Sequence, residues 1–150
     1  MFDERVRDKM KGAPLAPAPI NPQWIESGDP RASLAILAYS DDRATSTMLW
    51  ECTAGRFTWR YHCDETIYFL DGEVMISVEG RPARRYGAGD TLHFSRGAVA
   101  TWEVNGFIRK VAFCRSPPPR LFIAARRLAR AVYHRLRGRR DGLASAPAFG

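Results

Sequence analysis

Four side chains that could do chemistry recur at every second position of one short stretch: Trp59, Tyr61, Cys63 and Glu65. In an extended strand, side chains two residues apart share a face, so the four are expected to point the same way. A carboxylate in this company can bind a cation or exchange a proton, while aromatic faces supply stacking or cation–π contacts. The stretch therefore predicts a small-molecule pocket with Glu65 as its charged centre and its candidate catalytic residue.

Two residues further along the chain are expected to complete this pocket. Trp102 would be another aromatic wall, and Lys110 is expected at the rim. A carboxylate among indole rings loses hydration, which favours its neutral form unless a cation lies nearby. Either Lys110 or Arg109 could be that cation, and strand parity alone does not decide between them. The candidate ligand-binding residues are Trp59, Tyr61, Cys63, Trp102 and Lys110.

The sequence leaves open whether this pocket belongs to an enzyme. Cys63 is the one candidate nucleophile, but no histidine of matching parity accompanies it, so a small buried side chain is favoured. In the alternative interpretation, the tryptophans fill a narrow barrel and Glu65 hydrogen-bonds to backbone and to Tyr61. We favour the ligand pocket, because carboxylates in pockets are more often functional than carboxylates in cores.

Short strands separated by glycine turns would position these residues. Strand signals cover residues 33–39, 47–53, 56–61, 66–70, 73–78, 91–95, 100–104 and 108–114, with turns at 80–82 and 87–90. This pattern indicates an all-β fold, a small jelly-roll barrel. In a chain of 150 residues it predicts one domain. Residues 1–32 would form an N-terminal segment with a proline-rich extended arm, 33–116 the β-barrel, and 117–150 a basic C-terminal helix and tail.

The basic charge of the chain is concentrated in its C-terminal part. The formal net charge is +7, and residues 120–140 contain eight arginines and no acidic residue. Apolar residues recur there with helical spacing on the side opposite the arginines: Leu121, Leu128, Val132 and Leu136. This amphipathic α-helix could pack on the barrel or a second subunit, lie on an anionic membrane, or bind nucleic acid. Packing is favoured, and nucleic acid is disfavoured because no aromatic residue interleaves with the basic face.

Three features predict a cytoplasmic protein. The N-terminus is charged from its third residue, which does not suit the apolar core of a signal peptide. No stretch approaches the ~20 apolar residues of a transmembrane helix. The three cysteines, an odd number, suit reduced thiols better than a disulfide framework. Membrane association through the basic helix is the alternative to a freely cytoplasmic location.

The turns of the predicted barrel carry a family resemblance. Glu65 is followed after six residues by Gly72, and Gly89 and Gly97 have the spacing of a second motif, with Ser95 where that motif has proline. Further spaced matches over residues 47–115 are Trp50-Glu51-Cys52, Gly55, Phe57, Trp59, Tyr61, Asp64-Glu65-Thr66, Gly72-Glu73-Val74, Gly89-Asp90, Trp102-Glu103-Val104 and Arg109-Lys110. The chain thus resembles the cupin superfamily and, within it, the ureidoglycine aminohydrolase-like and ethanolamine-utilisation-like branch. The resemblance implies a cupin barrel and a homodimer.

The positions that would hold a metal in such a cupin are altered here. The resemblance implies three histidines and one glutamate as ligands, of which only Glu65 remains. The histidine positions are occupied by Trp59, Tyr61 and Ala100. The histidines that the chain does have are not in register to repair the set: His62, His93 and His134. We therefore expect no metal cofactor; the alternative is a degenerate site made of Glu65, Cys63 and Tyr61.

The sequence leads to one function and one alternative. The leading prediction is a cupin that binds a small polar metabolite in an aromatic-lined pocket centred on Glu65, with metal-independent proton transfer as a further step. The alternative is a non-enzymatic cupin module that its arginine-rich helix docks to a membrane or a protein partner. The metal-dependent ureidoglycine activity is not carried over, because its histidines are missing.

Overall fold

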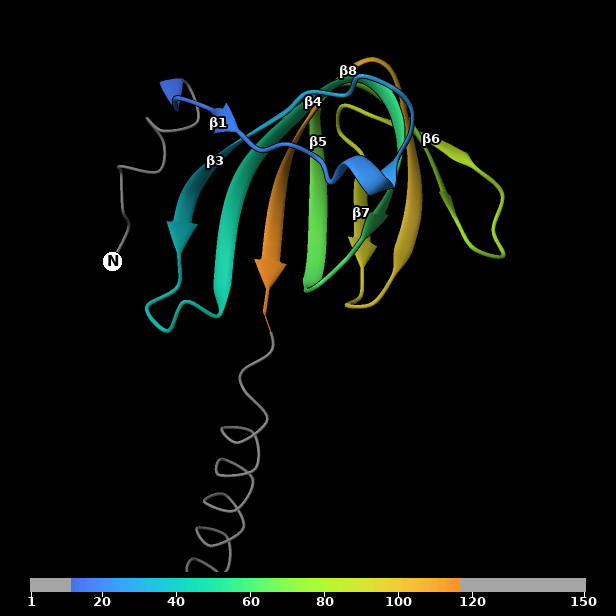
Figure 1. Cartoon of the computed structure of the whole chain (residues 1–150). Coiled ribbons are helices and arrows are strands. Elements are labelled where there is room, and N and C mark those ends of the chain that lie inside the picture. Colours follow the sequence, from blue (N-terminus) through green and yellow to red (C-terminus); the bar gives the residue numbers. More distant parts are fainter. Residues whose placement is uncertain (1–11, 117–150) are drawn as a thin grey trace, which may run out of the picture. The chain divides into compact units, whose positions relative to one another are not determined.

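The computed structural model describes residues 12–116, which form one antiparallel sheet of eight strands (Figure 1). The elements are β1 (Ala16–Pro17), the 3₁₀ turn η1 (Pro22–Trp24), β2 (Ile25–Gly28), β3 (Ala32–Tyr39), β4 (Thr45–Arg60), β5 (Asp64–Val78), β6 (Arg84–Gly87), β7 (Thr91–Phe94) and β8 (Val99–Arg115). Neighbouring strands run in the order β1-β3-β4-β8-β5-β6, while β2 pairs with β4 and β7 pairs with β5. The all-β prediction is confirmed, and the arrangement is consistent with a jelly roll. The predicted C-terminal helix lies outside the described residues.

Three long strands, β4, β5 and β8, form the centre of the sheet and curve around its interior (Figure 1). The sequence predicts a pair of short strands in place of each, and that division is wrong. The β4–β8 register shifts between Thr53 and Gly55, and the β5–β8 register shifts on both sides of residues 71–72. Bulges of this kind bend a strand without ending it. Each long strand therefore contributes to two walls of the barrel.

The interior of the barrel is lined mainly by aromatic side chains. Trp102 is fully buried at its centre, where its ring packs on Phe57 at 6.3 Å, Trp50 at 6.1 Å and Phe69 at 6.0 Å between centroids. These residues come from β4, β5 and β8 and face inward because alternate side chains of a strand point to one side. Large buried rings contribute much of the hydrophobic stabilisation of a small core.

A second apolar cluster lies apart from the barrel core. Its buried members are Ala35, Leu37, Leu49 and Val111. Ala13 and Leu15 of the N-terminal segment pack against this cluster, and β1 next to them pairs with β3. Proline disfavours regular structure in this segment, yet Ala16 and Pro17 pair with Leu34 and Ser33. Proline is tolerated there because β1 is the edge of the sheet.

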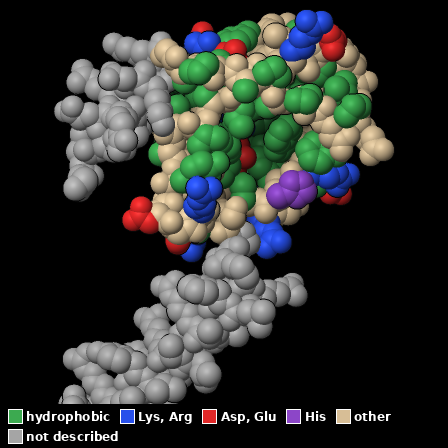
Figure 2. All heavy atoms as spheres, turned by 60° about the vertical axis from the view of Figure 1, so that its left-hand side comes forward, with side chains coloured by type: hydrophobic (Ala, Val, Ile, Leu, Met, Phe, Trp, Pro, Cys, Tyr) green, Lys and Arg blue, Asp and Glu red, His purple; other side chains and the backbone are tan. Residues whose placement is uncertain are grey.

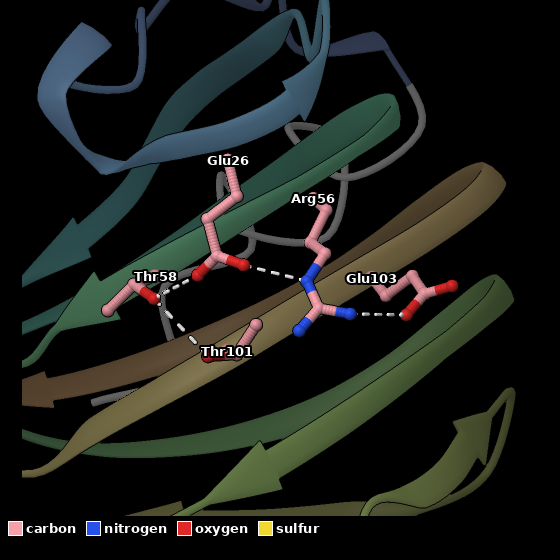
Figure 3. A network of polar contacts seen from close by, with 5 residues as sticks. All are labelled: Glu26, Arg56, Thr58, Thr101 and Glu103. Carbon is pink, nitrogen blue, oxygen red and sulfur yellow. Dashed lines mark hydrogen bonds and ion pairs between the residues drawn. The ribbon is translucent and has the colours of Figure 1, made fainter.

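A polar network on exposed side chains joins β2 to the central strands (Figure 3). Glu26 of β2 accepts from the Thr58 hydroxyl at 2.6 Å and from Arg56 Nε at 2.7 Å. Arg56 also donates to Glu103 of β8 at 3.2 Å. The Thr58 hydrogen bond first, and the Arg56 guanidinium second, lower the pKa of Glu26 below its ordinary value of 4.5. The network therefore stabilises the ionised form of this carboxylate.

Glu26→Gln is expected to reduce stability at neutral pH by at most about 1 kcal/mol, because the pair is exposed. A carboxylate whose pKa is lower in the folded state stabilises the fold above its unfolded pKa and loses that contribution as the pH falls through the folded pKa. The difference between wild type and variant should therefore shrink with acidification in urea denaturation. Glu79→Gln, at an exposed turn, is the control. A difference that persists far below pH 4.5 contradicts the assignment.

Candidate functional site

A buried ion pair lies inside the barrel. Lys110 Nζ of β8 donates to Glu65 Oε1 of β5 at 2.7 Å, and the two residues are 5% and 7% exposed. They are the buried charged residues of the described part of the chain. The predicted position of Lys110 at the rim is wrong. Arg109, its neighbour, points the other way and pairs with Glu51 at 2.7 Å, so the structure identifies Lys110 as the cation beside Glu65.

Lys110 also lies between two indole rings. Its Nζ is 4.9 Å from the ring centroid of Trp50 and 4.8 Å from that of Trp102. Cation–π attraction at these distances offsets part of the cost of burying an ammonium group. The sequence did not indicate Trp50 as a pocket residue. Its position becomes evident only from the pairing of β4 with β8, in which Trp50 stands directly opposite Lys110.

Two buried polar atoms next to this pair have no hydrogen-bond partner among the described residues: the Tyr61 hydroxyl and the Trp102 indole nitrogen. The Tyr61 backbone is fixed by hydrogen bonds with Ala98 and Gly97, and its ring stacks on Phe94 at 4.1 Å. Burial first, then the Glu65 carboxylate, raises the pKa of Tyr61 well above its usual value. The Trp102 N–H acts in the opposite direction, although the contact falls short of hydrogen-bond geometry.

An unpartnered buried donor costs free energy, so these two atoms are candidates to bind a polar group. The alternative in which Glu65 hydrogen-bonds to Tyr61 does not match the structure. The side-chain partners of Glu65 are Lys110 and Cys114.

Two thiols lie on the other side of Glu65. Cys114 stands opposite Glu65 in the β5–β8 ladder, with its Sγ 3.6 Å from Glu65 Oε2. Cys63 lies in the loop before β5, and the Sγ atoms of both cysteines and a Glu65 oxygen are within 4.8 Å of one another. Burial raises the pKa of both thiols, which keeps them neutral and argues against Cys63 as a nucleophile. Cys114 was missed, although it shares strand parity with Lys110.

The predicted row of four side chains does not lie on one strand. β4 ends at Arg60 and β5 begins at Asp64, so a loop separates Trp59 from Glu65. The loop still directs Tyr61 and Cys63 towards Glu65. Trp59 is half-buried against other rings, with Trp50 at 6.1 Å and Trp24 at 5.6 Å. The structure thus brings the candidate residues Tyr61, Cys63, Trp102 and Lys110 to Glu65, while Trp59 packs behind Trp50.

A cleft of about 440 Å³ opens between the second half of β5, β6 and β7. It is lined by Ile76, Val78, Arg81, Pro82, Arg84, Tyr86, Leu92, His93, Phe94, Ser95 and Ala98. Figure 2 shows one face of the molecule on which hydrophobic side chains surround a hollow with an acidic group inside it. Phe94 both lines the cleft and stacks on Tyr61. The cleft therefore adjoins the side chains that surround the ion pair.

The residues present do not fit the histidine set of a metal-binding cupin. Trp59 and Ala100, at two of the three histidine positions, are paired in the β4–β8 ladder and offer no oxygen, sulfur or free nitrogen lone pair. The third position is Tyr61, whose burial disfavours the phenolate form. His93, outside the set, is exposed and lies with its Nδ1 3.0 Å from the Thr66 hydroxyl. We derive no chemistry through a metal at those positions.

The described residues form an antiparallel β fold with a buried ion pair in its interior. Residues 39–112 match the family of EutQ-like cupin domains, and the chain belongs to the cupin superfamily. No match was found among curated proteins. Within residues 12–116, no helix is long and apolar enough to cross a membrane.

Solved structures agree with this fold. A DUF861-family protein of unknown function from Pseudomonas syringae pv. tomato superposes with a TM-score of 0.62 at 23% identity, covering 68% of this chain and 44% of that one. The chain therefore spans less than half the length of that relative. The ethanolamine utilization protein Q of Salmonella typhimurium superposes with a TM-score of 0.52 at 19% identity, covering 59% of this chain and 72% of that one. The EutQ protein of Clostridium difficile superposes with a TM-score of 0.51 at 18% identity, covering 58% of this chain and 69% of that one. At these identities the likeness concerns the fold. The predicted homodimer and the ureidoglycine aminohydrolase-like relationship stay predictions.

Proposed function

We propose that this cupin binds a small polar metabolite inside its barrel, with the Glu65–Lys110 pair as the charged centre. The observation that carries the proposal is the pair of unpartnered buried donors beside it, the Tyr61 hydroxyl and the Trp102 indole N–H. A ligand with a carbonyl or hydroxyl oxygen would accept from both. Such placement of a few polar groups among aromatic walls is typical of small-molecule sites.

The adjoining cleft supports the proposal. Its volume of about 440 Å³ lies within the range of ligand pockets, roughly 300–1,000 Å³. Aliphatic and aromatic side chains line most of it, and Arg81 and Arg84 stand among the lining residues. A bound molecule would place its polar end near Tyr61 and its remainder along the Phe94 ring.

Proton transfer without a metal is the catalytic extension of this site. Lys110 donates to Glu65 Oε1 and the Cys114 thiol donates to Oε2, so a ligand proton would have to reach a remaining lone pair of this carboxylate. A general base has to reach the proton that it removes within hydrogen-bond distance, so this step requires a ligand that extends from the Tyr61 hydroxyl and the Trp102 indole N–H as far as Glu65.

Tyr61→Phe is expected to weaken ligand binding at least about tenfold while leaving the free protein as stable as wild type or slightly more so. The variant loses a donor to the ligand but also removes a buried hydroxyl that has no partner. Thermal shift measurements with a panel of small amides, hydroxy acids, amines and polyols, all in the presence of a chelator, would identify a stabilising compound. Native mass spectrometry of the purified protein would report any molecule that co-purifies.

Tyr68→Phe is the matched control, because Tyr68 is exposed on β5 and should leave the shift unchanged. A stabilising compound whose shift is the same in wild type and Tyr61→Phe would contradict a ligand between Tyr61 and Trp102.

A further inference from the structure

Two thiols that the ligand site does not use form a cluster with Glu65. The cluster consists of the Cys63 and Cys114 thiols and a carboxylate oxygen of Glu65, and these atoms lie within 4.8 Å of one another. Cys114 and Glu65 are buried, and Cys63 is partly exposed in the loop between β4 and β5. Sulfur and carboxylate oxygen are ligands of thiophilic divalent metals, of which zinc is the commonest.

We propose that Cys63, Cys114 and Glu65 bind one thiophilic divalent cation of the zinc class inside the barrel. The site differs from the histidine set of metal-binding cupins, because both thiols stand at other positions and only the glutamate is shared. Zinc–sulfur bonds of about 2.3 Å and zinc–oxygen bonds of about 2.0 Å in a tetrahedron place sulfur and oxygen roughly 3.5 Å apart. The Cys114 Sγ to Glu65 Oε2 distance is 3.6 Å.

The buried charges around the cluster support a metal. Two thiolates and one carboxylate leave a divalent cation with one excess negative charge, and an uncompensated charge inside a barrel is costly. Lys110, at 2.7 Å from the other oxygen of Glu65, balances it. With the Lys110 ammonium included, the metal site would carry no net charge.

Three protein ligands would leave the fourth position of a tetrahedral ion for a water. The Tyr61 hydroxyl is a buried donor that has no partner among the described residues. It can donate to a water on the metal, as a neighbouring hydrogen-bonding group does in many metal sites. Binding converts two thiols into thiolates and releases two protons to solvent, with no oxidant required.

The metal site goes beyond the proposed ligand site and does not rest on it. The two share Glu65, but the thiols take no part in ligand binding as proposed above. The ligand tests run with a chelator, whereas the metal test runs without added ligand, so one can fail while the other succeeds.

Titration of the reduced, chelator-stripped full chain with Co²⁺ tests the proposal. One equivalent per chain is expected to produce thiolate-to-cobalt charge-transfer absorption and the d–d bands of a tetrahedral ion, and Zn²⁺ should abolish both. Thiolate bands can come only from Cys52, Cys63 or Cys114, because the chain has three cysteines. Cys63→Ser and Cys114→Ala are each expected to lower the apparent affinity by more than about 100-fold.

Cys52→Ala is the matched control, because Cys52 is a buried thiol outside the cluster and should leave the bands intact. Cys63 is partly exposed, so Cys63→Ser gives a folded variant even if Cys114→Ala does not. Cobalt bands that lack thiolate character, or that survive in Cys63→Ser, would overturn the proposal. So would a reduced protein that gives no bands but loses two thiols on mild oxidation, since this result would assign the pair to a disulfide.

Discussion

Glu65→Gln is expected to destabilise the protein by about 3–5 kcal/mol, because it leaves the Lys110 ammonium buried without its partner. Lys110 is 5% exposed, and its Nζ lies 2.7 Å from Glu65 Oε1. Lys110→Met should cost less, since a buried glutamate can take up a proton, whereas the ammonium keeps only its contacts with the two indole rings. Urea denaturation measured by Trp fluorescence and by circular dichroism gives the free energies of unfolding.

The double variant Glu65→Gln/Lys110→Met is expected to recover most of the loss, because two neutral side chains of similar size need no counter-charge. Glu51→Gln is the control. Glu51 pairs with Arg109, one position along the same strand ladder. Because Arg109 is partly exposed, loss of this ion pair should cost at most about 1 kcal/mol. If the two single effects simply add in the double variant, the pair is not coupled and the interior charges are independent.

This result also bears on tests of ligand binding. From the sequence, Glu65→Gln would be expected to remove ligand-induced stabilisation without affecting the fold. The Lys110 contact makes that single variant unsuitable, because a loss of ligand response could follow from a damaged interior. Tyr61→Phe separates the two effects, since its hydroxyl has no partner in the free protein.

The strand signals predict the all-β fold because they depend on local residue types. Alternation in 73–78 and 100–104, together with glycine turns, is enough to identify the strands and their inward faces. The same signals place strand ends wrongly at residues 54–55, 71–72 and 105–107. Glycines and polar residues interrupt the alternation there, but the chain continues through bulges into the second wall.

The site was less predictable, because its contacts join strands far apart in the chain. Parity within one segment correctly groups Tyr61, Cys63 and Glu65. The depth of Lys110 and the position of Cys114 depend on which residues of β8 stand opposite β4 and β5. That register is set by long-range pairing and by bulges, neither of which the local pattern contains. Once Lys110 is known to face inward, period-two alternation gives Cys114 at once.

Gly72→Ala is expected to destabilise the protein by at least about 3 kcal/mol. Gly72 has a φ of +78°, and a Cβ added there would collide with the Phe107 carbonyl oxygen. The obstacle is backbone of β8, which cannot move without breaking the β5–β8 ladder on both sides of the bulge. Thermal and urea denaturation would measure the loss.

Gly80→Ala separates the clash from the backbone strain. Gly80 has nearly the same φ, +75°, but an added Cβ would meet no atom within 4 Å. Replacing Gly80 by alanine should therefore lower the free energy of unfolding only by the cost of holding alanine in the left-handed conformation, about 1–2 kcal/mol. Equal losses in the two variants would mean that strain alone requires Gly72. A larger loss in Gly72→Ala would show that β5 and β8 approach too closely at this bend to accommodate any side chain. The bend lies seven residues after Glu65. It separates the half of β5 that carries the ion pair from the half that lines the cleft.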